Sequence, residues 1–131
     1  MYRVLLAIDD DESRALAQAN AIAEMPADED VTVHLCHVFR DNPEGASVNQ
    51  ISAIRRARER LDEAGIDTVH HEASGEPAAE ILAAAAEIDA DLICLSGRKR
   101  SPTGKAVFGS VTQAVIRGSD RPVVSVPRET T

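Results

Sequence analysis

Short apolar runs alternate with longer stretches of helical period along this chain, and the alternation leaves few folds open to it. Most of the apolar runs are dense in Val, Leu and Ile and do not alternate with polar residues. Runs of this kind are typical of strands that helices cover on both faces. The pattern therefore predicts an α/β fold around a central, mainly parallel sheet. The expected strands are residues 3–8, 31–39, 68–73, 92–96 and 123–126.

Four helices are expected between these strands, and capping residues indicate where they begin. The expected starts are Asp11 or Ser13 as the first cap, Ser47, Pro77 and Ser110. Ser47 and Ser110 each stand three residues before a Gln, which is the capping-box pattern. Residues 40–46 are expected to form an exposed loop. Ile51 is expected on the buried stripe of the second helix.

The charge and composition exclude several kinds of partner. The chain has 131 residues, with 14 Lys and Arg against 22 Asp and Glu, so its net charge of −8 repels nucleic acids. It contains no Trp, one Tyr and two Phe, which are too few aromatic side chains for a base-stacking platform. Neither a repeat nor a linker divides the sequence, so residues 1–131 are expected to form a single domain.

The first residues of the sequence give an expectation for the cellular location of the protein. Their apolar stretch ends at Asp9 and is too short for a signal peptide or a membrane span. We therefore expect a cytoplasmic protein with no membrane partner. Cys36 and Cys94 stand within apolar runs, where free thiols pack as small apolar side chains in a reducing compartment.

The segment between the fourth strand and the fourth helix carries an unusual local charge. Residues 96–105 include no acid and four cations, Arg98, Lys99, Arg100 and Lys105. Glycines and the free N–H groups at a helix start also favour phosphate, and right-handed crossovers bring every strand-to-helix loop to one edge of the sheet. An anion site is therefore predicted at this edge. The alternative is a surface loop whose cations only offset acidic surroundings.

Gly104-Lys105 in this segment is similar to the end of a phosphate-binding P-loop, but the match fails. Six residues separate Gly97 from Gly104 where the motif has four. Ala106 also replaces the hydroxyl residue that would bind Mg²⁺. An NTPase of the P-loop class is therefore excluded.

Four segments carry a recognisable pattern: VLLAID at 4–9, GEPA at 75–78, GSV at 109–111 and RPVVSVP at 121–127. Together they resemble the universal stress protein family over nearly the whole chain. The resemblance implies a three-layer α/β/α domain of the adenine nucleotide alpha-hydrolase-like type, with a five-stranded parallel sheet in the order 3-2-1-4-5. It also implies a regulatory stress-response protein that forms a homodimer through its last strand. The dimer contacts would fall on Val123, Val124, Ser125 and Val126.

Many members of that family bind ATP in the cleft between the first and fourth strands. The resemblance therefore implies an adenine-nucleotide site, with Mg²⁺ accompanying ATP. The adenosine contacts would fall on Ala7, Asp9 and Val38. The phosphate and ribose contacts would fall on Gly97, Gly109, Ser110 and Val111, beside the cations Arg98, Lys99 and Arg100.

Two of these residues have more than one interpretation. Asp9 either accepts hydrogen bonds from a ribose or an adenine, or it takes part in capping the first helix. Arg100 stands where ATP-binding members of the family have a second Gly. Its side chain either obstructs the path of the phosphates or holds them in a bidentate contact.

Other functions find less support in the residues. The acidic run after the first strand is similar to that of a receiver domain, but no phosphoacceptor Asp follows the third strand and no Lys precedes Pro122. His34 and His37 fall on opposite faces of their strand, as do His70 and His71, so no metal site is expected.

No base or nucleophile for dedicated catalysis stands out, and slow ATP hydrolysis would rest on a water held near the phosphates. Two functions remain open from the sequence. One is a homodimer that binds an adenine nucleotide, and the other is a homodimer without nucleotide that acts through protein contacts alone.

Overall fold

The computed structural model describes residues 2–9, 11–25, 30–39, 44–97 and 109–127 of the chain. In chain order the elements are β1 (Tyr2–Ala7), α1 (Glu12–Glu24), β2 (Val31–Phe39), α2 (Glu44–Glu63), β3 (Asp67–Ser74), α3 (Pro77–Ile88), β4 (Leu92–Ser96), α4 (Ser110–Gly118) and β5 (Val123–Val126). All expected strands are present, and their ends fall within one residue of the expected ones.

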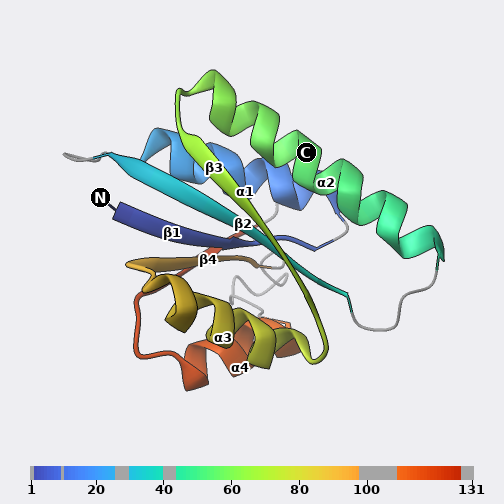
Figure 1. Cartoon of the computed structure of the whole chain (residues 1–131), viewed down its shortest axis with the longest axis vertical. Coiled ribbons are helices and arrows are strands. Elements are labelled where there is room, and N and C mark those ends of the chain that lie inside the picture. The colour runs from blue at the N-terminus through green and yellow to red at the C-terminus, as the bar shows by residue number, and fades with distance from the viewer. Residues whose placement is uncertain (1, 10, 26–29, 40–43, 98–108, 128–131) are drawn as a thin grey trace, which may run out of the picture.

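The strands form one parallel sheet in the order β3-β2-β1-β4-β5, and helices cover both of its faces (Figure 1). α1 and α2 pack on one face, and α3 and α4 pack on the other. This three-layer α/β/α architecture confirms the expected fold class and strand order. The chain order reverses between β1 and β4, and sheets of this kind bind ligands at such a reversal, beyond the carboxyl ends of the strands.

An aliphatic core lies on each face of the sheet. Leu5 and Leu6 follow one another in β1 and are both fully buried, one in each core. Successive side chains of a strand point to opposite faces, so this double burial explains the unbroken apolar run. On the α1 and α2 side the helices contribute several Ala residues, among them Ala19 and Ala57, whose small side chains let the helices lie close to the strands.

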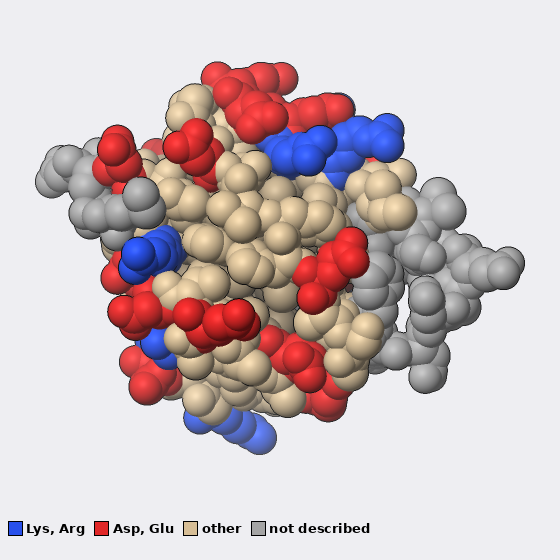
Figure 2. Space-filling view, in the orientation of Figure 1, with Lys and Arg blue, Asp and Glu red and all other residues tan. Residues whose placement is uncertain are grey.

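Charged side chains are spread over the surface. Figure 2 shows acidic side chains around an uncharged centre, with the basic side chains in smaller groups. The described helices include none that is both long enough and apolar enough to cross a membrane.

Two helix starts show how capping works in this chain. Oδ1 of Asp11 accepts hydrogen bonds from the N–H of Ser13 at 2.9 Å and from that of Arg14 at 3.2 Å. Asp11, rather than Ser13, is therefore the cap of α1. Pro77 begins α3 as expected, and the carboxylate of Glu76 accepts hydrogen bonds from two N–H groups of its first turn.

The other two expected helix starts are wrong. α2 begins at Glu44, three residues before Ser47, so the last part of the expected loop at 40–46 is helical. α4 has Gly109 as its N-cap, and Ser110 is already the first helical residue. The capping-box pattern occurs at both serines in the sequence, but neither serine occupies the N-cap position that the pattern requires.

Ile51 is also misplaced by the sequence analysis, because its side chain is 52% exposed. The buried stripe of α2 runs through Ala53, Ala57 and Leu61, at four-residue spacing. Ile51 stands two positions before Ala53, about 200° around the helix, and so points away from the core.

Candidate functional site

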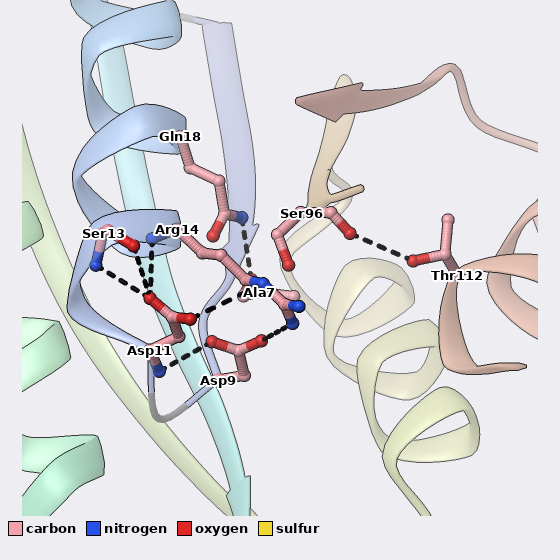
Figure 3. Close-up of polar contacts among 8 residues, drawn as sticks. All are labelled: Ala7, Asp9, Asp11, Ser13, Arg14, Gln18, Ser96 and Thr112. Carbon is pink, nitrogen blue, oxygen red and sulfur yellow. Dashed lines mark hydrogen bonds and ion pairs between the residues drawn. The ribbon is translucent and has the colours of Figure 1, made fainter. Parts of the chain in front are cut away.

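Gln18 links the ends of β1 and β4. Its side chain is fully buried, and Nε2 donates hydrogen bonds to the carbonyl oxygen of Ala7 at 2.9 Å (Figure 3) and to that of Cys94 at 3.4 Å. These bonds fix the two strands relative to each other where the strand order reverses. Gln18 is not among the predicted site residues, although a polar residue at a stripe position between Ala15 and Ile22 is a signal in the sequence.

Asp9 follows β1 directly and is oriented by its neighbours. Its Oδ1 accepts a hydrogen bond from the N–H of Asp11 at 2.9 Å, and its Oδ2 lies 3.1 Å from Nη1 of Arg14 (Figure 3). Asp11, and not Asp9, is the N-cap residue of α1. The side chain of Asp9 is 39% exposed, so an oriented carboxylate at the end of β1 can accept further hydrogen bonds. Arg14 is absent from the predicted site because its contact depends on the turn between β1 and α1.

The end of β4 is tightly packed at Gly97. Its N–H donates to the carbonyl oxygen of Val126 in β5 at 2.7 Å, and a Cβ at Gly97 would lie 2.7 Å from Oγ of Ser125. One residue earlier, the carbonyl oxygen of Ser96 accepts a hydrogen bond from Oγ1 of Thr112 at 3.3 Å (Figure 3). This bond ties the first turn of α4 to the end of β4. Packing against β5 thus favours a glycine at position 97 independently of any ligand, because a larger residue would have to displace the hydroxyl of Ser125.

α4 begins without a capping side chain. Gly109 occupies its N-cap with φ −70° and ψ 168°, and no side chain there accepts a hydrogen bond from the first turn. α1 and α3 differ, because the carboxylates of Asp11 and Glu76 cap them. Among the described residues, therefore, no side chain caps the positive end of the α4 dipole, and such an end favours an anion such as a phosphate.

The predicted site residues lie partly within the described structure. Those described are Ala7 and Asp9 at the end of β1, Val38 in β2, Gly97 after β4, and Gly109, Ser110 and Val111 at the start of α4. Parallel strands place the ends of β1, β2 and β4 at one edge of the sheet, and Val38 and Val111 pack against the same core. Outside the described residues lie Arg98, Lys99 and Arg100. The binding role of all ten stays a prediction.

Two pairs of histidines face each other across β2 and β3. Nδ1 of His34 lies 2.7 Å from Nε2 of His71, and Nδ1 of His37 lies 3.2 Å from Nε2 of His70. The sequence alone does not show this pairing, because it depends on the register of the two strands. Burial, and secondarily the neighbouring histidine, lowers the pKa of both His34 and His37.

Known proteins share this fold and sequence pattern. A universal stress protein from Archaeoglobus fulgidus is 27% identical, with a TM-score of 0.83 over 96% of this chain and 98% of that chain. A universal stress protein from the same organism, solved in complex with dAMP, is 21% identical, with a TM-score of 0.76 and the same two coverages.

More distant relatives have the same architecture. A universal stress protein family protein from Arabidopsis thaliana, solved with AMP bound, is 13% identical, with a TM-score of 0.64 over 99% of this chain and 94% of that chain. Among curated proteins, none matches this sequence. The universal stress protein family model, however, matches residues 1–127. Since that match spans nearly the whole sequence and the fold agrees with it, the chain belongs to the universal stress protein family.

Proposed function

We propose that this protein binds an adenine nucleotide at the carboxyl edge of its sheet and acts as a cytoplasmic, homodimeric regulator in the stress response. The observation that carries the proposal is the uncapped start of α4, tied to the end of β4 where the strand order reverses. Relatives of the same fold add support, because one was solved with dAMP and another with AMP.

The nucleotide would lie across the ends of β1 and β4. Asp9, oriented by Arg14, would accept hydrogen bonds from ribose hydroxyls or from the adenine amino group. N–H groups at Ser110 and Val111 would donate to the phosphates. The cations of residues 98–100 would add charge-assisted hydrogen bonds, and Mg²⁺ would accompany a triphosphate.

Calorimetric titration with ATP, ADP and AMP tests this site. Asp9→Ala is expected to weaken binding at least tenfold, since a hydrogen bond to a charged group contributes about 1.5–3 kcal/mol. Asp62→Ala, at an exposed position on α2, is the matched control and should bind as the unaltered protein does. No heat at millimolar ATP would refute nucleotide binding, and if the dimer persisted it would favour action through protein contacts alone.

We infer that the homodimer forms through β5. This four-residue strand lies at the edge of the sheet, and Val124 is 37% exposed on it. An edge strand offers N–H and C=O groups to a second strand, so two copies of β5 can pair and cover Val124.

Light scattering after size-exclusion chromatography tests the interface. Val124→Lys is expected to shift the protein towards monomer, because pairing would bury the new charge. Val69→Lys is the matched control, since Val69 is 43% exposed on β3 at the opposite edge. A monomeric unaltered protein, or dissociation caused by Val69→Lys alone, would contradict a dimer through β5.

A further inference from the structure

Three side chains with metal-binding atoms come together between β2 and β3. His37 belongs to β2, whereas His70 and Glu72 belong to β3, and the register pairs His37 with Glu72 and Leu35 with His70. Paired residues of parallel strands share a face, so all three side chains lie on the side of Leu35, which packs beneath α1 and α2. His37 is buried, and the other two are exposed at the edge strand. Their ligand atoms all lie within 4.8 Å of one another.

The distance between the two imidazoles suits a single metal ion. Nδ1 of His37 and Nε2 of His70 are 3.2 Å apart. Two nitrogens that each lie about 2.0–2.1 Å from a tetrahedral Zn²⁺ are about 3.3 Å apart, so the spacing of these two nitrogens, which is also that of a hydrogen bond between the rings, fits a shared ion. The carboxylate of Glu72 lies on an exposed side chain, and a change of rotamer can bring its oxygen to the same ion.

The second histidine pair lacks these properties and serves as a comparison within the same molecule. Nδ1 of His34 and Nε2 of His71 are 2.7 Å apart, a hydrogen-bond distance that is too short for two ligands of a tetrahedral ion. The positive charge of Arg3 also acts on His34 and would repel a cation. Within the described part of the chain, no third metal-binding side chain completes that pair.

We propose that His37, His70 and Glu72 bind a divalent transition-metal ion of the zinc type. Two imidazole nitrogens and one carboxylate oxygen form a donor set that suits Zn²⁺ and leaves a fourth position for water or another ligand. Mg²⁺ and Ca²⁺ prefer sites made of oxygen atoms alone, so this site differs in kind from one that holds the Mg²⁺ of a nucleotide. The bound ion ties the edge strand β3 to β2 and stabilises the folded chain.

Calorimetric titration with ZnCl₂ tests the site, using the full chain without a histidine tag and after removal of metals with EDTA. One ion per chain is expected, and Zn²⁺ should raise the midpoint of thermal unfolding. His70→Ala should weaken binding at least about 100-fold, and Glu72→Gln at least about tenfold, because each removes one ligand. Both side chains are exposed, so neither change removes core packing.

His71→Ala is the matched control, because it removes the next histidine on the opposite face of the same strand. It should leave Zn²⁺ binding unchanged. The proposal is overturned if no binding occurs up to about 1 mM Zn²⁺, if His70→Ala binds as the unaltered protein does, or if His71→Ala abolishes binding instead.

Co²⁺ supplies a second readout that needs no variant. The four-coordinate site predicts the intense visible absorption of tetrahedral Co²⁺, and the weak spectrum of the hydrated six-coordinate ion would contradict it. Both titrations are made without nucleotide, so their outcome is independent of the proposed nucleotide site.

Discussion

A carboxylate at position 109 should compete with a phosphate for the start of α4. Gly109→Asp is therefore expected to weaken nucleotide binding strongly while the fold stays intact. The backbone there has φ −70° and ψ 168°, a conformation that any residue adopts without strain. α1 shows what an Asp does at an N-cap, since Oδ1 of Asp11 lies 2.9 Å from the nitrogen of Ser13 and 3.2 Å from that of Arg14.

The same geometry on α4 would occupy the N–H groups of Val111 and Thr112. A phosphate at the helix start would then lie about 5 Å from the new carboxylate. At an effective dielectric constant of about 20, each unit of phosphate charge is repelled by about 3 kcal/mol, which corresponds to a loss of about 100-fold in affinity. Exchanging Gly for Asp at an N-cap changes the stability of the helix by only a few tenths of a kcal/mol, in the favourable direction.

Gly109→Asn separates the effect of charge from that of shape, because Asn caps about as well as Asp and is neutral. The affinity for AMP is measured by calorimetry and the free energy of unfolding by urea titration. We expect the Asp variant to lose at least about 100-fold in affinity and the Asn variant far less. Equal losses would show that the side chain acts by its size. An Asp variant that binds AMP normally would refute the assignment of phosphate binding to α4.

Three further changes test the packing around the site. Gly97→Ala is expected to destabilise the fold by about 1–3 kcal/mol in urea unfolding. The reason is that its Cβ would lie 2.7 Å from Oγ of Ser125. Adding Ser125→Ala should therefore recover part of the lost stability. Gln18→Leu is expected to cost about 1–3 kcal/mol in the same measurement, because the carbonyl of Ala7 loses a buried donor; an unchanged stability would contradict this. Burial raises the pKa of the Cys94 thiol from 9.0 to about 12. The fold therefore favours the protonated thiol, and this stabilisation is complete below pH 9 and lost as the pH rises through 12. Cys94→Ala should reduce the loss of stability between pH 9 and about 12, and an identical loss would contradict the shift.

The strands and the α/β class were predictable because their determinants are local, whereas the strand order came from the family resemblance. Leu5 and Leu6 are neighbours in the chain and lie in different cores. An unbroken apolar run of this kind indicates a strand that is covered by helices on both faces. Helix starts were less predictable, since a capping box can occur within a helix as well as at its start. Ser47 carries the pattern, yet α2 begins at Glu44, directly after Pro43, a residue type that is common at helix starts.

The positions of some candidate site residues follow from topology alone, although their binding role stays a prediction. Asp9 and Gly97 follow adjacent parallel strands, so their position at one edge needs no knowledge of side-chain contacts. Gln18 and Arg14 could not be placed in this way, because their partners depend on how α1 crosses the strand ends. The contact of His70 with its partner on β2 depends on strand register, which a single sequence does not reveal.

β2 contributes one residue to each proposed site, and the alternation of its side chains keeps the sites apart. Val38, which the family resemblance gives as an adenosine contact, packs against the core beneath α3 and α4. His37, its neighbour, points to the opposite face with His70. Gly109→Asp therefore leaves the metal ligands in place, and His70→Ala leaves the start of α4 in place. Because each variant disturbs one site alone, a variant that keeps the binding it should lose identifies which of the two proposals has failed.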